Sequence, residues 1–139
     1  MKTSAIFLLT LVLLTACNDD SYSPEVFSVK VNQEFTMRYN DEVRLDGEDF
    51  SIKFSKVPSD SRCPSDAMCI WEGQFIAQFI CPACDTNPFQ LTSRANRDEL
   101  AIYRDSSFEV ILLNVNPYPK TDFQIDLEKY QLTLIIKRI

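Results

Sequence analysis

The chain has 139 residues, 45% of them hydrophobic and ten of them Phe, so it can build one packed domain and is too short for two. Its formal net charge of −6 disfavours nucleic acid and anionic lipid head groups as partners. Histidine is absent, which excludes Ser-His and Cys-His nucleophilic pairs and histidine metal sites, and we expect no metal and no cofactor.

The first element is an export signal. Lys2 precedes an apolar run over residues 5–14, which is shorter than the about 20 residues that a membrane-spanning helix needs. A charged start, a short apolar run and small residues are typical of a secretory signal peptide, which we place at residues 1–16. The alternative for Cys17, which follows directly, is a chance cysteine after an ordinary signal peptide.

The end of this signal, Leu14-Thr15-Ala16-Cys17, resembles the lipobox of bacterial lipoproteins. In that family the cysteine thiol receives a diacylglyceryl group, cleavage occurs before the cysteine, and the new amine is acylated, for example with palmitate. The resemblance implies that Cys17 is the lipid attachment site and that the protein is anchored in the cell envelope, at the outer membrane. Two or more acyl chains would make this membrane anchor stable.

A polar segment follows the anchor. Residues 17–25 contain Asn, Asp, Ser and Pro and lack apolar periodicity, so we predict a lipidated N-terminus and a flexible tether. Residues 26–139 then form the domain.

From residue 26 onward, apolar and polar residues alternate with a period of two, which is typical of half-buried strands. The strand at 70–81 is expected to be central and covered on both faces, with Trp71, Phe75, Ala77 and Phe79 on one face and Ile76 and Ile80 on the other. A helical turn is plausible only at 93–100. We therefore predict an all-β domain, an Ig-like antiparallel β-sandwich or a small barrel. The other expected strands lie within 27–31, 35–39, 43–45, 50–54, 89–92, 100–103, 108–115 and 130–137.

With Cys17 assigned to lipid, four cysteines remain, and an even number in an exported chain predicts two disulfides. Three connectivities are possible, and we favour Cys63–Cys69 and Cys81–Cys84. A bridge between the first two would close a short loop and stabilise the domain by roughly 2–2.5 kcal/mol. A four-thiolate zinc site is the alternative that the spacing leaves open.

The segment over residues 57–73 contains Asp60-Ser61-Arg62-Cys63-Pro64 and ends in Trp71-Glu72-Gly73. It resembles small bacterial lipoproteins with a D-S-R-C-P-x4-C-x-W-x-G motif, and residues 112–119 and Tyr130 resemble them as well. The resemblance implies a secreted, β-rich envelope domain and transfers no catalytic role. The second cysteine pair departs from the family pattern.

The same segment is our candidate binding loop. Asp60 and Arg62 could pair within the loop or cap backbone groups, and Trp71 could pack on the core beside the disulfide. Tyr118 lies in the turn Asn116–Pro119, either as part of a rigid turn or as an exposed aromatic for carbohydrate or peptide. The loop is then either a rigid connection without chemistry or a recognition surface.

Cys81-Pro82-Ala83-Cys84 matches the C-P-x-C form of thiol–disulfide oxidoreductases, but Pro88 follows where a helix would have to continue. We therefore predict a non-catalytic binding, assembly or inhibitor module whose partner is an envelope protein or a glycan. A thiol redox protein that uses Cys81 and Cys84 is the alternative.

Overall fold

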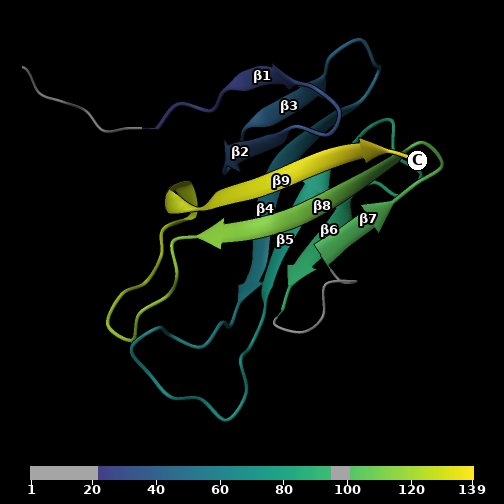
Figure 1. The fold of residues 1–139 in the computed structure, drawn as a ribbon. Coiled ribbons are helices and arrows are strands. Elements are labelled where there is room, and N and C mark those ends of the chain that lie inside the picture. Colours follow the sequence, from purple (N-terminus) through teal and green to yellow (C-terminus); the bar gives the residue numbers. More distant parts are fainter. Residues whose placement is uncertain (1–21, 95–100) are drawn as a thin grey trace, which may run out of the picture.

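The computed structural model describes residues 22–94 and 101–139 and confirms the all-β prediction (Figure 1). Two sheets pack face to face as a single-domain sandwich. Sheet A contains, in spatial order, β1 (Val26–Val29), β3 (Glu42–Leu45), β4 (Ser51–Asp60), β5 (Phe75–Ile80) and β6 (Phe89–Ser93). Sheet B contains β2 (Glu34–Arg38), β9 (Gln131–Arg138), β8 (Phe108–Asn116) and β7 (Ile102–Arg104), and the 3-10 helix η2 (Leu127–Lys129) precedes β9.

Neighbouring strands within each sheet are antiparallel, with the exception of β1, which pairs with β3 in parallel. Val26 lies opposite Glu42, and Glu42 lies opposite Lys53 of β4. The start of β1 therefore points toward the same end of the sandwich as the end of β4.

The core lies between the two sheets, as the period-two pattern predicts. In β2, Phe35 and Met37 are buried while their neighbours Glu34, Thr36 and Arg38 are exposed. Burial of each large apolar side chain stabilises the domain by about 1.5–3 kcal/mol. The largest fully buried side chains are Phe54, Phe75, Phe79, Met37, Ile52, Leu91, Leu132, Leu134 and Ile136.

The predicted strand at 70–81 is wrong at its start. β5 begins only at Phe75, because Gly73 has φ +70° and turns the chain out of an extended conformation. Ile70 and Trp71 lie in the preceding loop and are exposed. β5 has a neighbour on each side in sheet A but is not its middle strand, and its second face is not covered as predicted, since Ile80 is 41% exposed.

β4 is longer than the sequence predicted and runs through Pro58 to Asp60. Proline has no N–H to donate to a neighbouring strand, and the register of the β4–β5 pair shifts between Lys56 and Ser59. This irregularity admits Pro58 into the strand. Of the helical turn predicted at 93–100, Ser93 ends β6 and residues 95–100 lie outside the described residues.

Both favoured disulfides are present. Cys63 and Cys69 are bonded with their Cα atoms 5.9 Å apart, and Cys81 and Cys84 with their Cα atoms 5.4 Å apart. Because the four cysteines are divided between two bridges, they do not form a four-thiolate zinc site.

The predicted tether is held against the domain over its last residues. The carboxylate of the buried Asp41 accepts hydrogen bonds from the Tyr22 hydroxyl, from the backbone N–H of Glu25 (2.8 Å) and from that of Arg38 (2.7 Å). Cys17 and the predicted signal peptide lie outside the described residues. Within the ranges that are described, the structure contains no helix with the length and apolar character of a membrane span.

The two ends of the sandwich differ. The β4–β5 loop (61–74) and the β8–β9 loop (117–130) leave one end together, the first at the bottom of Figure 1 and the second on its left; we call this the loop end. Short turns at 46–50, 81–88 and 105–107 close the other end, which we call the turn end.

Candidate functional site: the loop end

A buried ion pair lies at the base of the loop end. The Arg62 guanidinium binds the Asp60 carboxylate through both oxygens, with Nε–Oδ1 at 2.9 Å and Nη2–Oδ2 at 2.7 Å. Only 7% of the Arg62 side chain and 10% of the Asp60 side chain are exposed. This is the bidentate geometry that makes arginine–carboxylate pairs strong and directional, and it confirms the predicted pairing within the loop.

The same guanidinium holds the β8–β9 loop. Arg62 donates through Nη1 to the carbonyl of Val115 (3.0 Å) and through Nη2 to that of Pro117 (2.9 Å). The Tyr130 hydroxyl donates to Asp60 Oδ2 (2.8 Å). The pair thus joins the end of β4, the end of β8 and the start of β9, through one carbonyl in β8 and one in the loop that follows it.

The surroundings of Asp60 and Tyr130 fix the protonation state of both side chains. Burial on its own would raise the pKa of Asp60, but the hydrogen bonds from Arg62 and Tyr130 and the charge of Arg62 outweigh it and hold that pKa below its usual value. Burial and the Asp60 carboxylate raise the pKa of Tyr130 well above its ordinary range. Asp60 therefore stays ionised and Tyr130 stays protonated at neutral pH, which suits a structural brace rather than a proton-transfer site.

A second set of contacts joins the tips of the two loops. The backbone N–H of Ser65 donates to the carbonyl of Pro119 (2.9 Å), and Thr121 donates to Asp66 through its backbone N–H (3.0 Å) and its hydroxyl (2.8 Å). The bonds from Thr121 lower the pKa of the Asp66 carboxyl. The Cys63–Cys69 disulfide closes the first loop between these contacts and the base.

Gly73 lets the two arms of the β4–β5 loop approach each other. A Cβ at this position would lie 1.7 Å from the carbonyl oxygen of Ser61. The close approach extends the pairing beyond β5, with Ser61 N–H donating to the Gln74 carbonyl (2.8 Å) and Cys63 N–H to that of Glu72 (2.9 Å). Only glycine fits here, because both the contact and the positive φ exclude a side chain.

A hollow of about 230 Å3 opens beside this brace, with walls from both sheets and from both loops. It is large enough for one amino-acid side chain or one sugar ring and smaller than a typical drug-sized pocket. Its lining is polar and mixed in charge, and consists of Arg62, Glu72, Gly73, Ser93, Arg94, Leu113, Asn114, Val115 and Tyr118.

Two exposed aromatic rings stand at this end, each beside a guanidinium. Arg62 lies over the Tyr118 ring (5.1 Å to the centroid) and Arg94 over the Trp71 ring (5.2 Å). Trp71 is 54% exposed, so the expectation that it packs on the core beside the disulfide is wrong. Its ring lies instead on Arg94, whose Nε is 3.9 Å from Glu72 Oε1.

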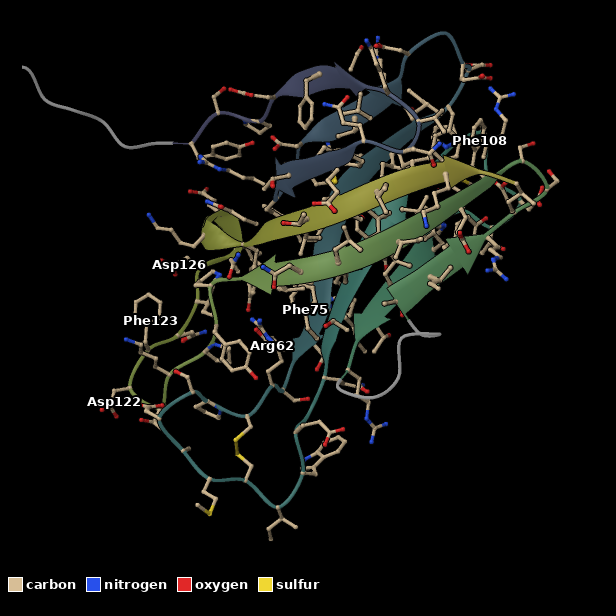
Figure 2. All side chains as sticks on the ribbon, in the orientation of Figure 1. Arg62, Phe75, Phe108, Asp122, Phe123 and Asp126 are labelled. Carbon is tan, nitrogen blue, oxygen red and sulfur yellow. A yellow bond between two sulfur atoms is a disulfide. The ribbon has the colours of Figure 1, made fainter. Side chains whose placement is uncertain are left out.

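Of the residues that the sequence singled out, Asp60, Arg62 and Tyr118 come together in one network, and Trp71 lies in the same β4–β5 loop as Arg62. Figure 2 shows Arg62 at the base of the two loops. The sequence analysis did not single out Arg94, which directly follows β6 and belongs to no motif. The role of Gly73 could have been found, because it is one of only two glycines and closes the motif.

The C-P-A-C pair lies at the turn end, away from this site. Cys81 is fully buried, and its backbone N–H donates to the Asn87 side chain (3.0 Å). A turn follows Cys84 rather than a helix, so the pair lacks the helix N-terminus that activates the nucleophile of thiol oxidoreductases.

In the part of the chain that the structure describes, no three Cys, Asp or Glu residues gather in a group that could hold a metal ion. Comparisons with protein-family models, curated proteins and solved structures give no match to this chain. What the molecule does must therefore be argued from its own residues.

Proposed function

We propose that this protein is a lipid-anchored, non-catalytic binding module of the cell envelope, attached to the outer membrane through Cys17. The loop end is its contact surface, and an envelope protein or a glycan is its partner. The lipobox supports the anchor, and the braced loops support the binding role.

The observation that carries the proposal is the buried Asp60–Arg62 pair, which locks two long loops into one unit. A loop that is only a connection does not need a buried charge, since burying ions costs free energy unless every partner is in place. A rigid surface, by contrast, loses little conformational entropy when it binds.

The residue types on this unit suit molecular contact. Trp71 and Tyr118 are about half exposed, and Arg94 lies beside the first of them. Trp, Tyr and Arg are the side chains that most often dominate binding interfaces. The hollow beside Tyr118 would take one protruding group of the partner, with Asn114 and Glu72 available for its polar atoms.

The test is site-specific photo-crosslinking in intact cells, with the full chain expressed in its native host. A photoreactive amino acid replaces Tyr118, and in a matched control it replaces Ile80, which is 41% exposed on the outer face of sheet A. We expect a discrete protein or carbohydrate adduct from position 118 and none from position 80. The double substitution Trp71→Ala and Arg94→Ala should abolish it.

Equal labelling at both positions, or none at either, would refute a specific contact at the loop end. The anchor is tested separately by Cys17→Ala, which should release the protein from the membrane fraction and remove the mass of the lipid. A Cys17→Ala protein that stays membrane-bound would contradict the lipid anchor.

A further inference from the structure

Exposed apolar side chains follow one edge of the molecule, from η2 to the tip of the β4–β5 loop. Leu127 and Phe123 are 46% and 55% exposed, and Met68 and Ile70 at the tip are fully exposed. Figure 2 shows Phe123 directed outward from the β8–β9 loop, next to Asp122. The hydrogen bonds of Thr121 to Asp66 join the β8–β9 loop to the tip, so these side chains belong to one connected pair of loops.

The described chain begins beside the same edge. Arg38 lies over the Tyr22 ring (4.9 Å to the centroid), and Arg38 pairs with Gln131, two residues after the end of η2. Asp41 holds the Tyr22 hydroxyl and the Glu25 backbone. The point at which the chain joins the domain is therefore fixed close to Leu127.

The length of chain before Tyr22 limits how the domain can sit on a membrane. Five residues lead from Cys17 to Tyr22 and span at most about 18 Å. The Tyr22 hydroxyl is held by Asp41, whose backbone bonds to that of Phe54, and β4 continues six residues beyond Phe54 to Asp60, which is about 20 Å. A domain standing on its loop tip would hold Tyr22 beyond the reach of the lipid, whereas a domain lying on the edge would not.

We propose that this edge lies in the interface of a zwitterionic bilayer, with Phe123 and Leu127 among the head groups and the long axis of the sandwich along the membrane. The inference rests on the lipid anchor of the proposed function. Aromatic and leucine side chains are those that favour the interface. The turn end differs from this edge in exposing the ion pairs of Arg104 and Arg138.

The charge of this edge favours zwitterionic over anionic lipid. The same edge contains the exposed Asp122, Asp126 and Glu128, against Lys120 and Lys129. This acidic excess is repelled by anionic lipid and tolerated by phosphatidylcholine, so added anionic lipid should weaken the contact.

The experiment uses tryptophan as a depth probe, because Trp71 is the only tryptophan of the chain. The full lipidated protein carrying Trp71→Phe and Phe123→Trp is reconstituted in phosphatidylcholine vesicles that contain a shallow spin-labelled lipid. The matched control carries Trp71→Phe and Ile80→Trp. We expect the spin label to lower emission from position 123 about twofold or more, and emission from position 80 much less.

Equal quenching at the two positions, or none at position 123, would overturn the proposal. Flotation of the same vesicles separates this outcome from a failed anchor. Protein that floats without quenching at position 123 is anchored and does not lie on this edge, while protein that does not float contradicts the anchor itself. Quenching at 123 that grows when phosphatidylglycerol is added would refute the choice of lipid.

Discussion

The loop end and the turn end of the sandwich differ in how their connecting segments are held in place. At the turn end the connections are shorter, and much of their bonding is local: Asp105 accepts hydrogen bonds from the backbone N–H groups of Ser107 and Phe108, both at 2.7 Å, while a single bond from Ser106 to Asp85 (3.0 Å) joins two of the turns. At the loop end two long connections are held by each other, through Arg62 and through the Asp66–Thr121 contacts.

The difference shows where buried charge is needed. A tight turn satisfies its backbone groups within a few residues, so the turn end uses exposed pairs such as Arg104–Glu109, which are worth little. At the loop end, one buried guanidinium donates to the carbonyls of both Val115 and Pro117. The loop end should accordingly be the more sensitive to substitution.

The largest difference is expected at the two glycines, one at each end. Gly73→Ala should destabilise the domain by about 4 kcal/mol or more, because its Cβ would overlap the Ser61 carbonyl at a positive φ. Gly47→Ala, at φ +77° with open space around it, should cost only about 1 kcal/mol. Denaturant unfolding of both variants measures the difference in their free energies of unfolding. Equal losses of stability would contradict the close approach at Gly73.

The next largest difference in stability is expected between substitutions of Arg62 at the loop end and Arg104 near the turn end. Arg62→Met leaves the Asp60 carboxylate buried without its charged partner and should cost about 3–5 kcal/mol. Arg104→Met removes an ion pair whose arginine side chain is 68% exposed and should cost at most about 1 kcal/mol. Urea midpoints report both values; an Arg62→Met protein as stable as Arg104→Met would show that the brace contributes nothing.

Each end also has one disulfide. Replacing Cys63 and Cys69 by Ser should cost about 2 kcal/mol, and replacing Cys81 and Cys84 should cost about as much, since both close short loops. Only the first pair should weaken crosslinking from position 118, because it alone lies at the loop end. Loss of crosslinking in the second pair would contradict the separation of the two ends.

The smallest expected effect concerns pH and the Tyr130 hydroxyl. The lowered pKa of Asp60 means that its contribution to stability is complete above its unfolded pKa and is lost as pH falls through the folded value. The raised pKa of Tyr130 means that its contribution is complete below its unfolded pKa of about 10 and is lost as pH rises above it. Tyr130→Phe should cost about 1.5 kcal/mol at pH 7 and remove the alkaline loss. An unchanged alkaline profile would argue against the Tyr130–Asp60 hydrogen bond.

The sequence predicts the fold better than it predicts the site. Alternation such as Phe35-Thr36-Met37 reports directly which side chains face the core, and the spacing of the cysteines limits their pairing. The same pattern wrongly assigned Ile70 and Trp71 to the strand, because apolar residues just before a strand look like its first residues. Both side chains are in fact exposed in the preceding loop. Arg94 had no local signal: its place beside Trp71 depends on how β6 ends next to the β4–β5 loop.

The central claim is that the two long loops form one rigid surface, and hydrogen–deuterium exchange of the full chain tests it most directly. The backbone N–H groups of Ser61, Cys63 and Ser65 are bonded to Gln74, Glu72 and Pro119, so they should exchange as slowly as amides in β5. Thr121→Val, which removes one contact at the tip, should speed exchange at Ser65 and leave Ser61 protected. Exchange of all three amides at the rate of an unprotected chain, while β5 stays protected, would contradict the braced loop end.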